Sequence, residues 1–73
     1  MLGVGLASPI FIAVTQKRLQ ILDAAAELIA EKGFVQTSVD DVIARAGLSG
    51  KSHFYHYFKS KESLGHEVLA RQF

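Results

Sequence analysis

Apolar residues recur with a helical period over residues 16–32, and this pattern predicts a long first helix. The apolar positions fall at i, i+4, i+7 and i+8 on one face of an α-helix. They are Ile21, Ala25, Leu28 and Ile29. Thr15 is suited to cap the start of this helix, and Gly33 supplies the left-handed residue that commonly ends helices.

Two shorter helices follow, separated by a glycine turn. Ser38 and Asp41 have the spacing of a capping box for a helix over residues 39–46. Gly47 and Leu48 close that helix, whose apolar side carries Val39, Val42, Ile43 and Ala46. Phe54 and Phe58 are one helical turn apart, which predicts a helix over 52–58 that buries both rings. A short helix, a tight turn and a second short helix form a helix-turn-helix.

Ser60 is a good N-cap for a fourth helix over residues 61–73. We expect Leu64, Val68 and Leu69 of this helix to point inward, and Phe34 to fill the core. No glycine or proline stops the helix before Phe73, which favours a larger parent protein. The predicted fold is all-α: a three-helix bundle with a helix-turn-helix, plus the start of a fourth helix.

Residues 1–14 are apolar and almost uncharged, but Pro9 and two glycines interrupt them. A membrane-spanning helix needs about 20 apolar residues, and a signal peptide carries its basic residues before the apolar run. We therefore expect a poorly ordered extension outside the domain formed by residues 15–73. A weak contact with a membrane or a partner protein is the alternative for this segment.

The charge of the chain is unevenly distributed. Residues 15–46 carry four basic and five acidic side chains, a balance of −1, whereas residues 47–61 carry Lys51, Lys59 and Lys61 with no acid. A local basic stripe is typical of a nucleic-acid interface, while the net charge of +1 for all 73 residues indicates little. The chain has no cysteine, so it can form neither a disulfide nor a thiolate metal site.

Three other chemistries find weak support in the same stretch. His53 and His56 are three residues apart but lack a third metal ligand at a suitable spacing. Gly50–Ser52 resembles the end of a nucleotide-binding P-loop, yet Arg45 occupies the position that requires glycine. Ser52 with His53, or Ser60 with His56, could suggest a nucleophile and a base, but no carboxylate lies near either imidazole in the sequence to orient it. We therefore predict no enzymatic activity, no cofactor and no metal.

The polar residues of this region form a surface rich in hydrogen-bond donors, suited to phosphates and base edges. The plainer interpretation is a solvated helix face with incidental aromatic residues. The candidate nucleic-acid-binding residues on this surface are Lys51, Ser52, His53, Tyr55, His56 and Tyr57.

Several blocks in the same order resemble the N-terminal DNA-binding domain of the tetracycline-repressor (TetR) family of bacterial transcription regulators. The blocks are Ile21-Leu22-Asp23-Ala24-Ala25, Glu31-Lys32-Gly33-Phe34, Thr37-Ser38-Val39, Ala46-Gly47-Leu48-Ser49, Phe54-Tyr55-His56-Tyr57-Phe58 and Lys59-Ser60-Lys61-Glu62. The resemblance covers residues 15–73. The chain departs from the family in having one more residue between Gly47 and Phe54 and an isoleucine, Ile43, where alanine is usual.

The resemblance implies a cytoplasmic regulator, in most cases a repressor, that binds double-stranded DNA with its third helix in the major groove. It implies that Tyr55, His56 and Tyr57 contact phosphates and base edges, that Lys61 holds a phosphate, and that Ser38 contacts the backbone. The full-length family member would be a homodimer with a small-molecule effector in a second domain, which this chain lacks, so we expect the fragment to be monomeric. The alternative functions are a truncated interaction or interference module and a peptide tethered to a membrane by residues 1–14.

Overall fold

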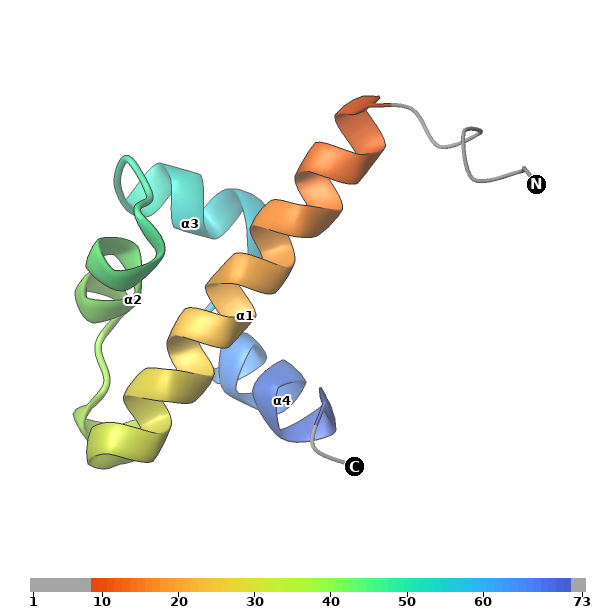
Figure 1. Ribbon diagram of the computed structural model, residues 1–73. Coiled ribbons are helices and arrows are strands. Elements are labelled where there is room, and N and C mark those ends of the chain that lie inside the picture. Colours follow the sequence, from red (N-terminus) through yellow and green to blue (C-terminus); the bar gives the residue numbers. More distant parts are fainter. Residues whose placement is uncertain (1–8, 72–73) are drawn as a thin grey trace.

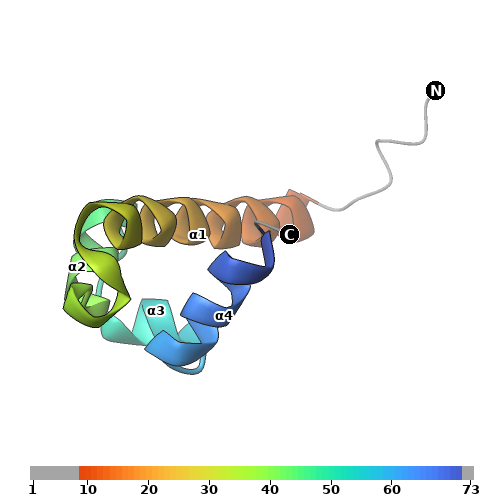
Figure 2. The same cartoon turned by 90° about the horizontal axis from the view of Figure 1, so that it is seen from below.

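The computed structural model describes residues 9–71, with side chains from residue 16 onward, and these residues form four helices and no strand. The helices are α1 (Pro9–Gln36), α2 (Val39–Ala46), α3 (Lys51–Tyr57) and α4 (Lys61–Arg71) (Figure 1). α1 packs against α2 and α4, and α2 packs against α3. Seen from below, α1 forms one side of the molecule and α3 lies opposite it, with α2 and α4 at the two ends (Figure 2). The all-α prediction is confirmed.

α1 begins earlier than the sequence pattern predicts. Its backbone is helical from Pro9, so Thr15 lies inside the helix and cannot be its N-cap. A proline at the first helical position gives up no intrahelical bond, because the first amides of a helix have no partner. Residues 9–14 of the expected extension therefore continue α1, and residues 1–8 lie outside the described part. None of the helices between Pro9 and Arg71 combines the length and the apolar character that crossing a bilayer requires.

Gly33 bends the end of α1, as the sequence predicts, but with a different backbone conformation. Its φ is 84° and its ψ is 158°, a region open almost only to glycine, rather than the left-handed helical region. The chain then makes a further turn to Gln36. Thr37, only 3% exposed, closes this turn by donating its hydroxyl and amide hydrogens to the Gly33 carbonyl, at 2.8 and 3.2 Å.

α2 has the predicted bounds and the predicted caps. The amide of Asp41 donates to the Ser38 hydroxyl and the amide of Ser38 donates to the Asp41 carboxylate, both at 3.0 Å, which completes the capping box. Gly47 is left-handed, with a φ of 72°, and the following amide of Leu48 donates to the carbonyl of Ile43 at 2.9 Å. Leu48 is buried beneath the helix pair, so the predicted helix-turn-helix is confirmed.

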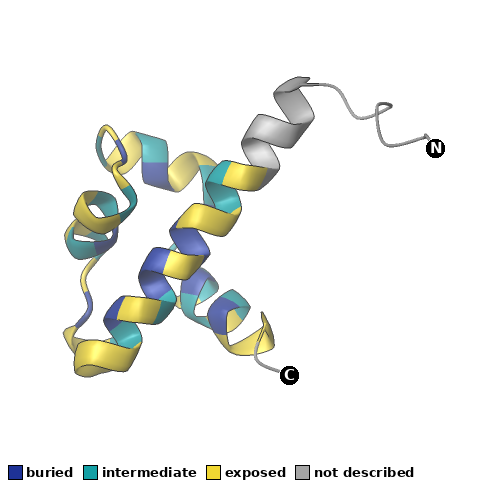
Figure 3. Cartoon of the chain, in the orientation of Figure 1, coloured by how far each residue is buried: buried dark blue, intermediate teal, exposed yellow. Residues whose placement is uncertain are grey.

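The core lies between α1 and the other three helices (Figure 3). α1 contributes the apolar stripe that its periodicity predicts, and each later helix adds one or two large side chains. The cluster consists of Ile21, Leu22, Ala25, Leu28, Val42, Leu48, Phe54, Phe58, Leu64 and Val68. Ile43 is half-buried and packs against this cluster from α2, so the larger side chain is accommodated at the edge of the core.

α4 differs from the prediction in which side chains it buries. Ser60 caps it, because its hydroxyl accepts from the Ser63 amide at 3.1 Å. Leu64 and Val68 are buried, but Leu69 is 57% exposed, since it lies five residues after Leu64 and so turns away from the core. The predicted helical residues 72–73 lie outside the described range.

Phe34 is not part of the core as predicted. Its ring is half-buried on the surface of α4, between the Lys61 ammonium, 4.5 Å from the ring centroid, and Gly65. A Cβ atom on Gly65 would lie 2.6 Å from the nearest ring carbon of Phe34. The bend at Gly33 therefore directs Phe34 towards α4, and the glycine in α4 provides the space for its ring.

Candidate nucleic-acid interface

α3 is held in place by two buried phenylalanines. Phe54 is fully buried, Phe58 is nearly so, and their ring centroids lie 5.9 Å apart. The helix begins at Lys51, one residue before the prediction, and ends at Tyr57. Phe58 is the extended C-cap, and its amide donates to the Phe54 carbonyl at 3.1 Å. Because one face of α3 is fixed in the core, its remaining side chains must face outward or sideways.

The structure sorts the predicted site residues of α3 by exposure. Lys51, Ser52, Tyr55 and His56 are exposed, and the Tyr55 side chain is open over 49% of its surface. His53 and Tyr57 are half-buried, with ring centroids 5.8 Å apart. Tyr57 packs against the edge of the core, so it is less available than the sequence suggests.

His53 is fixed by the turn that precedes α3. Its Nδ1 accepts a hydrogen bond from the Ser49 amide at 3.2 Å and lies 3.3 Å from the Ser49 hydroxyl oxygen. With Nδ1 acting as an acceptor, the proton of the neutral imidazole resides on Nε2. His53 therefore presents a hydrogen-bond donor from a ring of defined orientation.

The two predicted site residues outside α3 have contacts of their own. The hydroxyl of the exposed Ser38 accepts the Asp41 amide in the capping box. The Lys61 ammonium donates to the Val35 carbonyl at 3.3 Å and lies above the Phe34 ring. Lys61 is the first residue of α4, as predicted, but its side chain already links α4 to the end of α1.

The charged side chains between α1 and α2 neutralise one another. The Arg45 guanidinium lies 3.0 Å from a Glu27 carboxylate oxygen and 3.1 Å from Glu31, and its hydrogen bond lowers the pKa of Glu31. Lys32 pairs with Asp41 at 2.8 Å. This pair, together with the bonds from Ser38, lowers the pKa of Asp41 from its ordinary 3.8 to about 2.

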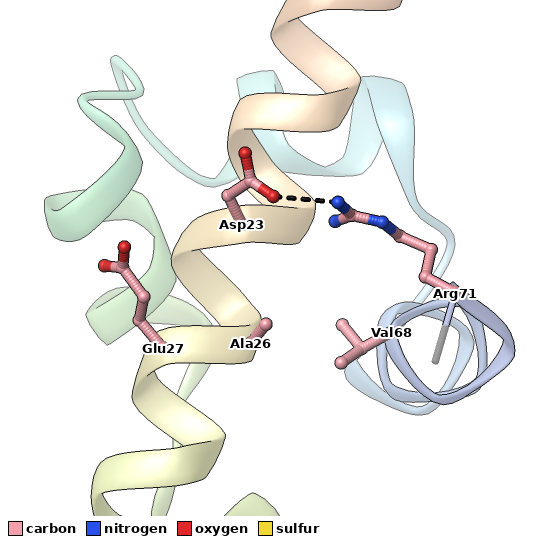
Figure 4. Close-up of a pocket in the computed structure, with 5 residues that line it drawn as sticks. All are labelled: Asp23, Ala26, Glu27, Val68 and Arg71. Atoms are coloured by element: carbon pink, nitrogen blue, oxygen red, sulfur yellow. Dashed lines mark hydrogen bonds and ion pairs between the residues drawn. The ribbon is translucent and has the colours of Figure 1, made fainter. Parts of the chain in front are cut away.

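A pocket of about 350 Å³ lies between α1 and α4, away from the predicted site residues (Figure 4). Asp23, Ala26, Glu27, Val68 and Arg71 line it. Arg71 reaches across from α4 and donates to Asp23 of α1 at 2.9 Å. Because this guanidinium is already paired, the pocket offers no free cation, and it does not include any of the predicted site residues.

The lysines around α3 have no such partners. Among the residues whose side chains are described, 16–71, four cations form no ion pair with a carboxylate. They are Lys17, Lys51, Lys59 and Lys61. Lys51 is the first residue of α3, Lys59 lies in the connection after it, and Lys61 is the first residue of α4. The predicted basic stripe is therefore left uncompensated, which suits a polyanionic ligand.

One residue that contacts the interface was not among the predicted site residues. Arg18 of α1 donates to the carbonyl of Tyr57, the last residue of α3, at 2.8 Å. The two residues are 39 positions apart, and no short-range pattern connects them. Only the basic character of residues 17 and 18, just before the apolar stripe of the first helix, marks the position in the sequence.

Comparison with known proteins places this arrangement among bacterial regulators. The profile of the family described as "Bacterial regulatory proteins, tetR family" matches residues 21–68. The chain is 45% identical over 53 residues to the HTH-type transcriptional repressor KstR2 of Rhodococcus jostii, covering 73% of this chain and 26% of that protein. It is 44% identical over 48 residues to the fatty acid metabolism regulator protein of Bacillus subtilis, covering 66% and 24%.

A third relative, the KstR2 repressor of Mycolicibacterium smegmatis, is 42% identical over 53 residues, which cover 73% of this chain and 25% of that protein. The chain thus spans about a quarter of the length of these relatives. No solved structure shows a significant match to the chain. The matched residues include all of α2 and α3 and the whole core cluster, and the chain belongs to the tetR family of bacterial regulatory proteins.

Proposed function

We propose that the chain is the DNA-binding head of a transcription repressor and that α3 enters the major groove of double-stranded DNA. The observation that carries this proposal is the division of α3 into a buried and an exposed side. Phe54 and Phe58 anchor one face, while Lys51, Ser52 and Tyr55 are exposed, and the nearby lysines have no carboxylate partner within residues 16–71. The major groove is wide enough to admit an α-helix, and its phosphate walls attract uncompensated positive charge.

The geometry favours different roles for the site residues. Tyr55 and His53 are the candidates for reading bases. The Nε2 donor of His53 is suited to the acceptors that the major groove exposes, guanine O6 and N7, adenine N7 and thymine O4. Lys51, Ser52 and His56 are placed to contact phosphates, and the half-buried Tyr57 to support His53.

The two site residues outside α3 would contact the DNA backbone. The Ser38 hydroxyl accepts a bond within the capping box but keeps its own hydrogen for a phosphate. Lys61 would exchange its 3.3 Å contact with the Val35 carbonyl for a phosphate oxygen. Such contacts position a protein on DNA without reading its sequence.

Repression, dimerisation and effector binding belong in this proposal to a longer protein. Two of the three relatives above carry the word repressor in their names, and the chain spans only about a quarter of each. A single head should bind DNA with a Kd in the range of about 10⁻⁴ to 10⁻⁶ M, which is typical of non-specific binding. Two linked heads gain effective concentration and bind a double site more tightly.

The test is a titration of the chain, fused to a dimeric coiled coil, against a duplex selected from a random library and against its scrambled version. Tyr55→Ala should weaken binding to the selected duplex by about 1–3 kcal/mol and binding to the scrambled duplex by less. Lys61→Ala should weaken both equally and lower the slope of log affinity against log salt by about 0.9.

Two results would contradict the assignment. If Lys61→Ala changed the sequence preference while Tyr55→Ala preserved it, the recognition surface would lie elsewhere. If selection enriched no duplex at all, the chain would act as an interference or interaction module, the alternative function of such a fragment.

A further inference from the structure

A single arginine joins three helices at the end of α3. Arg18 lies on α1, and one of its guanidinium nitrogens donates to the Tyr57 carbonyl at 2.8 Å. The other terminal nitrogen forms an ion pair with Glu67 of α4. The guanidinium carbon lies 4.4 Å from the ring centroid of Phe58, which continues the chain beyond α3.

These contacts matter because α3 is short. With seven residues, it makes few internal hydrogen bonds, and the last four carbonyls of any helix lack intrahelical partners. Arg18 supplies a partner to one of these carbonyls and places a positive charge at the negative end of the helix. α3 otherwise packs chiefly against α2, so Arg18 provides a direct link from α1 and α4 to the end of α3.

The same contacts argue against a phosphate-binding role for Arg18. Its charge is compensated by Glu67, whereas Lys51 and Lys59 have no carboxylate partner in the described part of the chain. Its planar fork is engaged on two nitrogens, and its flat face covers the Phe58 ring. A lysine could not replace it, because a single ammonium cannot make the two forked contacts and the stacking together.

We propose that Arg18 is a positioning residue for DNA recognition. It fixes the C-terminal end of α3 against α1 and α4, and thereby sets the orientation in which Tyr55 and His53 meet the bases. That Arg18 fixes the end of α3 is an inference from the structure alone. That it thereby affects DNA recognition rests on the proposed function.

The test uses the 73-residue chain itself, as wild type, Arg18→Lys and Glu67→Gln. Amide hydrogen exchange followed by NMR compares α3 with α2. In Arg18→Lys, exchange in α3, including the Phe58 amide, should become about tenfold faster relative to α2, because a hydrogen bond from a charged donor is lost. Glu67→Gln keeps the bond to Tyr57 and loses only a partly exposed ion pair, so it should accelerate α3 exchange about two- to threefold.

DNA titrations of the same variants, each fused to the dimeric coiled coil described above, supply the second readout, using the selected and scrambled duplexes. Arg18→Lys should reduce the ratio of the two affinities about three- to tenfold, which is less than the loss of a whole base contact, because the contact is misaligned rather than removed. The salt slope should stay the same, because no phosphate contact is removed.

Three outcomes would overturn the proposal. A salt slope lowered by about 0.9 in Arg18→Lys would mean that Arg18 binds a phosphate. Equal acceleration of exchange in α2 and α3, with an unchanged affinity ratio, would mean that Arg18 only stabilises the fold. A wild-type coiled-coil fusion without any duplex preference would refute the proposed function and the recognition role together, while the exchange data would still decide whether Arg18 holds α3.

Discussion

The surface between α1 and α2 and the surface of α3 both carry several charged side chains, but they differ in how those charges are used. Arg45 bonds to Glu27 and Glu31, and Lys32 bonds to Asp41, so both cations of the first surface have carboxylate partners. Around α3, none of the lysines has a carboxylate partner among residues 16–71. The two surfaces differ in how their charges are paired rather than in the number of charges, and our proposal that α3 binds DNA rests on this difference.

The helices α2 and α3 are also stabilised in different ways. α2 is closed at both ends by its own sequence, through the Ser38–Asp41 capping box and the left-handed Gly47. α3 has no side-chain hydrogen bond at its N-cap, Gly50, and depends on the burial of Phe54 and Phe58. α3, which carries the proposed recognition residues, thus obtains its stability from tertiary contacts.

The largest expected effect comes from removing an anchor of α3. Phe54→Ala should lower the free energy of unfolding by about 3–5 kcal/mol, because Phe54 is fully buried. That loss approaches the whole stability of a small domain. Its exposed neighbour offers the control: Tyr55→Ala should cost less than about 1 kcal/mol. Thermal melts followed by circular dichroism would contradict this contrast if both variants melted at similar temperatures.

The connection between α1 and α2 can be broken through the backbone alone. Gly33→Ala should destabilise the fold by about 1 kcal/mol or more, because a φ of 84° is strained for alanine even though no atom lies within 4 Å of the added Cβ. Gly50→Ala is the matched control, since its site is equally open and its backbone is extended. Equal melting temperatures for the two variants would show that the strain is absent.

The contrast between paired and unpaired cations can be tested with two substitutions that each remove one positive charge. Lys51→Gln should lower the salt slope of binding to an arbitrary duplex by up to about 0.9, because it removes a phosphate contact. Arg45→Gln should leave the slope nearly unchanged, since Arg45 is occupied by Glu27 and Glu31. The opposite ranking of the two slopes would reverse our assignment of the binding surface.

The smallest expected effect concerns acid stability. The folded pKa of Asp41, about 2, lies below its ordinary 3.8, so the ionised form stabilises the fold above pH 4. This stabilisation should disappear as the pH falls from about 4 to about 2. Asp41→Asn should therefore show a weaker decline in melting temperature over that interval than the wild type. Asp40→Asn, a neighbour without an ion-pair partner in residues 16–71, should retain the wild-type decline.

The features that were predicted correctly depend on residues close together in the sequence. The capping box spans Ser38 to Asp41, the helix-turn-helix follows from Gly47 and Leu48, and the anchors Phe54 and Phe58 are one turn apart. Local spacing determines each of these contacts, so a single sequence is enough to find them. The division of α3 into a buried and an exposed side follows from the same spacing.

The errors have two origins. The early start of α1 at Pro9 is a local feature that follows no periodic signal. The other errors arose where distant elements meet: the bend at Gly33, for example, sends Phe34 to α4. The links from Arg18 to Tyr57 and Glu67 span 39 and 49 residues. Such contacts depend on how the helices pack, so the sequence alone could not identify Arg18 as a neighbour of α3.

The position of α1 has a consequence for the synthesis of this protein on the ribosome. α1 is translated first, yet the residues that cover its apolar stripe include Leu64 and Val68, which are translated last among the core residues. At about 5–20 residues per second, roughly 2 to 8 seconds separate the translation of Leu28 from that of Val68. Small helical proteins with mostly local contacts fold in microseconds to milliseconds, so the pace of translation, rather than the search for the fold, sets how long the stripe stays uncovered.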